Sequence, residues 1–116
     1  MIDDVITALK NASGPWGKNV YRGQPPNFTI LPVVGVYMLN ESDFVAGDGK
    51  GMQAFKGFVN IDIWTKDRIE DIKTSVRAAM YGLSGYVRQN AFRELVEDNG
   101  LKHLQFEFEI ILGGFK

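Results

Sequence analysis

The 116 residues are 45% hydrophobic, 23% charged and 12% aromatic, which is typical of one globular domain spanning residues 1–116 and excludes a disordered chain. Thirteen basic residues against fourteen acidic ones give a net charge of -1, so the sequence lacks the basic cluster that a specific nucleic-acid contact requires. It contains no cysteine, which excludes disulfides and thiolate metal sites and fits synthesis in a reducing cytoplasm.

The N-terminal residues predict a helix. Apolar side chains recur at helical spacing over residues 2–12, and Asp3 and Asp4 suit the positive end of a helix dipole. The acidic start also differs from a secretory signal. The longest apolar stretch, residues 30–39, is far shorter than the ~20 residues of a membrane-spanning helix. We therefore expect no membrane insertion.

Residues 13–29 are rich in glycine, proline and asparagine but hold aromatic residues such as Trp16, so we expect an ordered irregular segment. The β-rich residues that follow predict a strand from Pro32 to Leu39. From Asn40 to Gln53, alternate glycines and mixed charges predict a mobile loop.

Residues 54–83 predict a strand followed by an amphipathic helix. Asp67 as N-cap and Glu70 three residues later form a predicted capping box, and apolar residues at helical spacing continue to Leu83. In the strand, Ala54–Lys66, alternation places Val59, Ile61 and Ile63 on one face and Phe58, Asn60, Asp62 and Trp64 on the other.

The C-terminal residues predict a hairpin. Strands over residues 91–97 and 101–112 flank Asp98-Asn99-Gly100, and Asn-Gly supplies the positive φ of a tight turn. In the last strand, alternation separates an apolar face, Leu104, Phe106, Phe108, Ile110 and Leu112, from a wet face, Gln105, Glu107 and Glu109.

These elements predict an α+β fold in the order α-β-β-α-β-β. We expect a two-layer sandwich in which two helices pack on one face of a largely antiparallel four-stranded sheet. The other face would carry polar residues and one large aromatic residue that a monomer has little reason to display: Asn60, Asp62, Trp64, Glu107 and Glu109.

No motif predicts a cofactor or a metal. GDGKG at 47–51 lacks the hydroxyl residue and the following helix of a phosphate-binding loop. Glu41, Asp43 and Asp48 lack the ligand order of a calcium loop, and His103 is the single histidine, which leaves a transition-metal site without further ligands.

Glu107 and Glu109 share a face and could form a carboxylate pair for acid–base chemistry, although a solvated or interfacial strand face explains them more simply. Asp62 lies between two isoleucines, so we expect it to have a specific polar partner. Trp64 is equally consistent with internal packing and with anchoring a protein interface.

The segments LPVVGVYML, VNIDIWTK, IEDIKTSVRAAMYGLSG and LQFEFEI resemble the small tail-completion proteins of long-tailed bacteriophages, the tail terminator or tail-to-head joining family. The resemblance covers most of the chain from about residue 30 and departs from the family's usual pattern over residues 11–28. It implies a structural protein and not an enzyme. Such subunits form a ring, commonly of six, that caps the tail tube, faces the head connector and lets DNA pass through its lumen.

On this resemblance, the chain would be made in a bacterial host cytoplasm and belong to the tail or neck of a virion or prophage. We hypothesise that Asn60, Asp62, Trp64, Glu107 and Glu109 lie at or near subunit contacts. The loop of residues 41–53 would touch the tail tube protein or line the lumen, through Glu41, Asp43, Phe44, Asp48, Lys50 and Met52.

Three alternatives stay open. A head-closure or neck protein also forms rings but docks on the portal side. A small ligand-binding or enzymatic α+β domain would use the cleft beside residues 40–53 together with Glu107 or Glu109. A cytoplasmic adaptor would pair with its partner through a sheet edge.

Overall fold

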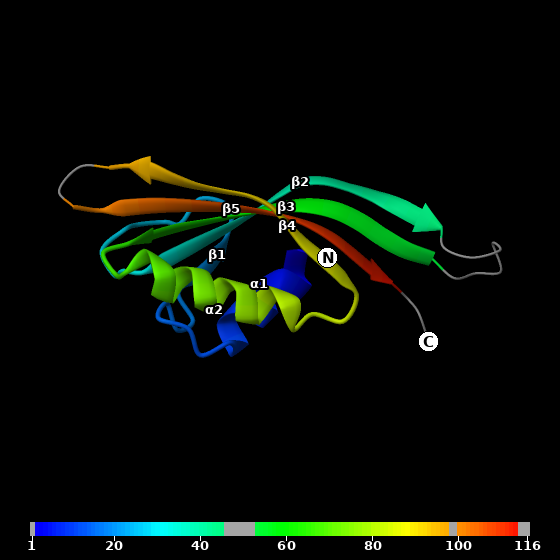
Figure 1. The fold of residues 1–116 in the computed structure, drawn as a ribbon, viewed down its shortest axis with the longest axis horizontal. Helices are drawn as coiled ribbons and strands as arrows, with labels where there is room; N and C mark the ends of the chain where they lie inside the picture. Colours follow the sequence, from blue (N-terminus) through cyan, green and yellow to red (C-terminus); the bar gives the residue numbers. More distant parts are fainter. Residues whose placement is uncertain (1, 46–52, 98–99, 114–116) are drawn as a thin grey trace.

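The structure is a computed structural model that describes residues 2–45, 53–97 and 100–113 (Figure 1). Within these ranges the chain forms two helices and five strands. In chain order they are α1 Ile2–Asn11, β1 Val20–Arg22, β2 Val33–Val45, β3 Gln53–Thr65, α2 Ile69–Tyr81, β4 Tyr86–Val96 and β5 Lys102–Gly113.

The strands form one mixed sheet in the order β1-β2-β3-β5-β4. β1 runs parallel to β2, and the other neighbours are antiparallel. The prediction of four strands in a largely antiparallel sheet, with the order α-β-β-α-β-β, is therefore wrong, although the fold is α+β. The sequence pattern missed β1 because this strand has three residues, too few to show alternation, and lies in a stretch of turn-forming residues.

Both helices lie on the same side of the sheet (Figure 1). α1 packs beside α2 and against β1 and β2. The strand alternation predicted for β3 and β5 is confirmed, because the register pairs Ile61 with Phe106 and Val59 with Phe108, and all four side chains are buried. The helices add the apolar stripes Ile2, Val5 and Leu9 from α1 and Ile72, Val76, Ala79 and Met80 from α2 to this core.

The start of α2 differs from the predicted capping box. The N-cap residue is Arg68, which makes no side-chain capping hydrogen bond. The Asp67 carboxylate is thus not the cap; instead, the Asp67 backbone N–H donates to the Thr65 hydroxyl over 2.9 Å. This bond turns the chain at the end of β3, with Asp67 two residues before α2 begins at Ile69. At the other end, Gly82 is the C-cap and the helix ends at Tyr81, before the predicted last apolar position, Leu83.

Strands β2 and β3 are longer than expected, with 13 residues each. The predicted loop of residues 40–53 is wrong at both ends, because the backbone ladder continues from Asn40 opposite Phe58 to Val45 opposite Gln53. Residues 46–52 lie outside the described residues. In Figure 1 this pair of strands extends well past the two helices, which gives the molecule its long axis of 54 Å.

The segment before β2 is ordered and irregular, as expected, apart from β1. Trp16 is buried, and its indole N–H donates over 2.8 Å to the Leu9 carbonyl near the end of α1, where helix carbonyls lack partners. Beyond β1 the chain passes to the face of the sheet away from the helices, where Phe28 packs on Trp64. A Cβ on Gly35 would lie only 2.6 Å from the Gly23 carbonyl oxygen, so this crossing requires glycine at position 35.

Candidate functional site

The candidate site is the sheet face opposite the helices, which we call the outer face. The strand registers arrange its residues in rows that run across β2, β3, β5 and β4. The first row is Val33, Trp64, His103 and Leu95; the second is Gly35, Asp62, Gln105 and Arg93; the third is Tyr37, Asn60, Glu107 and Ala91; the fourth is Asn40, Phe58, Glu109 and Arg88.

The first row is aromatic. Trp64 stacks on the imidazole of His103 with ring centroids 4.4 Å apart, and Trp64 and Phe28 pack edge to face with centroids 4.9 Å apart. Only 7% of Trp64 is exposed. The sequence left open whether Trp64 packs internally or anchors a protein interface. In the single chain, Trp64 packs internally. Phe28, which is 39% exposed, is the aromatic ring that remains accessible there.

His103 links the aromatic row to two carboxylates. Its Nε2 lies 3.6 Å from Asp62 Oδ2, and its Nδ1 lies 3.2 Å from Glu97 Oε1. The imidazole side chain is 13% exposed. Asp62 thus has the polar partner that its position in a strong strand predicted, and a protonated His103 would pair with both acids.

The middle of the outer face holds buried polar atoms without hydrogen bonds. Among the described residues these are Asn60 Oδ1, Asp62 Oδ1 and His103 Nε2. Each such atom costs about 1–3 kcal/mol relative to one that has a partner. Glu107 lies opposite Asn60 in the register, and within the described part of the chain it forms no ion pair. Acceptors therefore gather in the second and third rows without donors.

The two carboxylates that the sequence suggested as a pair, Glu107 and Glu109, have different neighbours. Glu107 and Glu109 share the outer face, as predicted, but Glu109 is 3.5 Å from the ammonium of Lys56. No group of three or more His, Asp or Glu residues within the described ranges is placed to hold a metal ion. The two glutamates therefore differ in their surroundings, since Glu109 is paired with a cation and Glu107 is not paired within the described residues.

Tyr37 reports the electrostatics of this surface. Its hydroxyl bonds to Gln24 Oε1 over 3.0 Å, and burial together with the negative charge of Asp62 raises its pKa above the ordinary value of 10.0. The folded chain therefore keeps this proton at a pH where the unfolded chain loses it. The free energy of unfolding should fall as the pH rises from about 10 through the raised pKa.

We expect Asp62→Asn to lower the pKa of Tyr37 without returning it to 10.0, because burial, the larger cause, stays. The measurement is an ultraviolet absorbance titration of tyrosinate, with Tyr37→Phe subtracted to isolate this residue in each background. An identical Tyr37 titration with and without the Asp62 charge would contradict the prediction.

The residues predicted for a tube or lumen loop are placed only in part. Glu41, Asp43 and Phe44 belong to the backbone of β2, while Asp48, Lys50 and Met52 lie outside the described residues. The sequence reasoning did not select Phe28, Glu97 or Arg93 for the site. The alternation of residues 91–97 could have indicated Arg93 as an outer-face residue, whereas no periodic signal indicated Phe28.

Known proteins resemble this chain in structure and not in sequence. A scan against protein families finds no match, and no curated protein matches the sequence. One chain of the virion of a native gene transfer agent (GTA) particle superposes with a TM-score of 0.57 at 16% sequence identity, covering 95% of this chain and 92% of that chain. This likeness shows a shared fold over nearly the whole chain. Among the described residues, no helix is long and apolar enough to cross a membrane.

Proposed function

We propose that this chain is a structural protein of a phage-like virion, in which it forms a ring that caps the tail tube and joins it to the head connector. Two independent likenesses support the proposal. The strand and helix sequences resemble the tail terminator family, and the fold matches a chain of a gene transfer agent virion over 95% of this chain. In this role the protein has no catalytic residues.

The observation that carries the proposal is the incomplete outer face. Within the described ranges no donor reaches the buried acceptors Asn60 Oδ1 and Asp62 Oδ1, whereas such groups in native proteins normally have partners. Packing of copies against one another would supply them. Subunit contacts would then lie at or near Asn60, Asp62, Trp64, Glu107 and Glu109. The parts of β2 and β3 that extend past the helices, which we call the β2–β3 arm, would point their end toward the tube or the lumen.

The first test is the solution mass of the purified chain, measured by light scattering over a wide concentration range, with negative-stain images of the same samples. Rings of one fixed subunit number, with a central opening, are the expected result. Isolated tails and isolated heads are then offered as binding partners. Binding to heads alone would assign a head-closure role, and a monomer that binds neither would contradict the proposal.

A further inference from the structure

Three oxygen-bearing groups on the outer face lie close together, and their oxygen atoms can accept hydrogen bonds but cannot donate them. They are the free carboxylate oxygen Asp62 Oδ1, the amide oxygen Asn60 Oδ1 and the Glu107 carboxylate; the first two are buried and have no donor. Asp62 is 8% exposed as a residue. Since residues two apart on a strand are about 7 Å apart, one or two cationic side chains could serve all three. We call this group the acceptor cluster.

Three basic or donor residues near the cluster are directed elsewhere. Arg93 shares a row with Asp62 but donates to Gln105 Oε1 over 3.4 Å. Lys56 pairs with Glu109. His103 approaches Asp62 only through the other carboxylate oxygen, at 3.6 Å. None of the residues that the structure describes therefore donates to the acceptor cluster, which keeps its negative charge.

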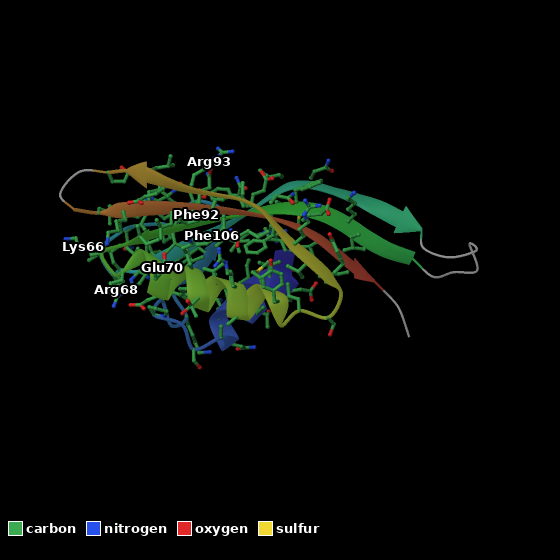
Figure 2. The ribbon with its side chains drawn as sticks, viewed as in Figure 1. Lys66, Arg68, Glu70, Phe92, Arg93 and Phe106 are labelled. Atoms are coloured by element: carbon green, nitrogen blue, oxygen red, sulfur yellow. The ribbon has the colours of Figure 1, made fainter. Side chains whose placement is uncertain are left out.

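Two basic residues, in turn, lack acidic partners among the described residues. Lys66 and Arg68 are exposed, and neither forms an ion pair with the described residues. They lie in the turn between β3 and α2, at the end of the sheet away from the β2–β3 arm (Figure 2). Arg68 is the N-cap of α2, where the helix dipole disfavours a cation. A carboxylate from outside would stabilise both the arginine and the helix end.

These residues cannot satisfy one another within one chain. Asp62 and Lys66 are four residues apart along β3 and its end, about 13 Å in an extended strand, and the row of Trp64 and His103 lies between them. The turn of a second molecule can reach the acceptor cluster without crossing the row of Trp64 and His103. The complementary sites also lie at different places on the molecule, which is the arrangement of a head-to-tail contact.

We propose that the acceptor cluster of one copy binds the Lys66–Arg68 turn of a second copy of this chain. Arg68 is the principal donor, because its planar guanidinium can serve two acceptors at once. The guanidinium of the second copy contacts the half-buried Glu107 first, and it then lies above Asn60 and Asp62. This inference rests on the proposed function, since it names the contact through which the ring would assemble.

The test is a charge exchange. Glu107→Lys and Arg68→Glu are each expected to weaken self-association at least about tenfold, because each places like charges in contact. The double variant reverses the pair and should restore association to within about threefold of the original. Arg77→Glu is the matched control, since Arg77 is exposed on α2, on the side of the sheet away from the outer face (Figure 1). Light scattering gives the association, and circular dichroism checks that every variant is folded.

The outcomes separate this inference from the function. Single variants that associate like the original chain, or a double variant that stays as weak as the singles, would overturn the inference while rings of the original chain support the function. If the original chain stays monomeric and is nevertheless incorporated into virions, that result would likewise overturn the inference and support the function. Normal self-association with loss of attachment to tails would assign the acceptor cluster to another virion protein and would also overturn it.

Discussion

Phe106→Ala is expected to lower the free energy of unfolding by about 3–5 kcal/mol, the range for truncating a buried phenylalanine. Phe106 is fully buried in β5, opposite Ile61 in the register. Its ring lies 4.9 Å from Phe92 and 6.4 Å from Phe108. Figure 2 shows Phe92 and Phe106 on the side of the sheet that faces α2. Truncation leaves a cavity where the helix meets the sheet.

A loss of this size is a large part of the roughly 5–15 kcal/mol that holds a domain together. Urea unfolding followed by circular dichroism measures it. Phe92→Ala is the matched control: Phe92 is only half-buried on β4, and one side of its ring faces the Lys73 ammonium at 4.7 Å, so its truncation should cost clearly less. Equal losses at the two positions would mean that the core is not centred on β5.

The elements with clear periodicity were predictable. Strict alternation from Val59 to Trp64 fixed which residues of β3 face the core, and the register confirms it. The same holds for Leu104 to Leu112 in β5. These strands are paired on both sides within the sheet and covered by helices on one face, so their sequences carry a period of two.

The missed features come from contacts that leave no local pattern. β1 is recognised by its parallel pairing with β2, which is decided by residues distant in sequence. β4 was expected to begin at Ala91 but begins at Tyr86, because a register shift between Gln89 and Ala91 interrupts its alternation. Composition alone made residues 40–45 resemble a loop, although they continue a ladder.

The candidate site was predicted as a face and not as a set of contacts. Asn60, Asp62, Glu107 and Glu109 were placed on one side of the sheet by alternation, and the registers agree. That Asp62 meets His103, or that Glu109 meets Lys56, depends on how far one strand is shifted along the next. A shift of this kind is set by turns and packing across the whole sheet.

Gly85→Ala is expected to cost about 2–6 kcal/mol, because two penalties of about 1–3 kcal/mol each add at this position. Gly85 joins α2 to β4 with φ of +134°, a conformation that side chains disfavour, and a Cβ there would lie 2.5 Å from the Ile111 carbonyl oxygen. Since that oxygen belongs to the backbone of β5, relief requires β4 to move away from its partner.

The control for this prediction is Gly100→Ala. Gly100 also has a positive φ, +75°, but a Cβ added there would meet nothing within 4 Å, so only the backbone penalty of about 1–2 kcal/mol applies. Thermal and urea unfolding of the two variants separate the clash from the strain. Because β4 places Arg88 opposite Glu109 and Arg93 opposite Gln105, Gly85→Ala should also disturb the outer face. An equal, small loss in both variants would show that β4 can shift along β5 at little cost, and the rows of the outer face would then not be fixed by this turn.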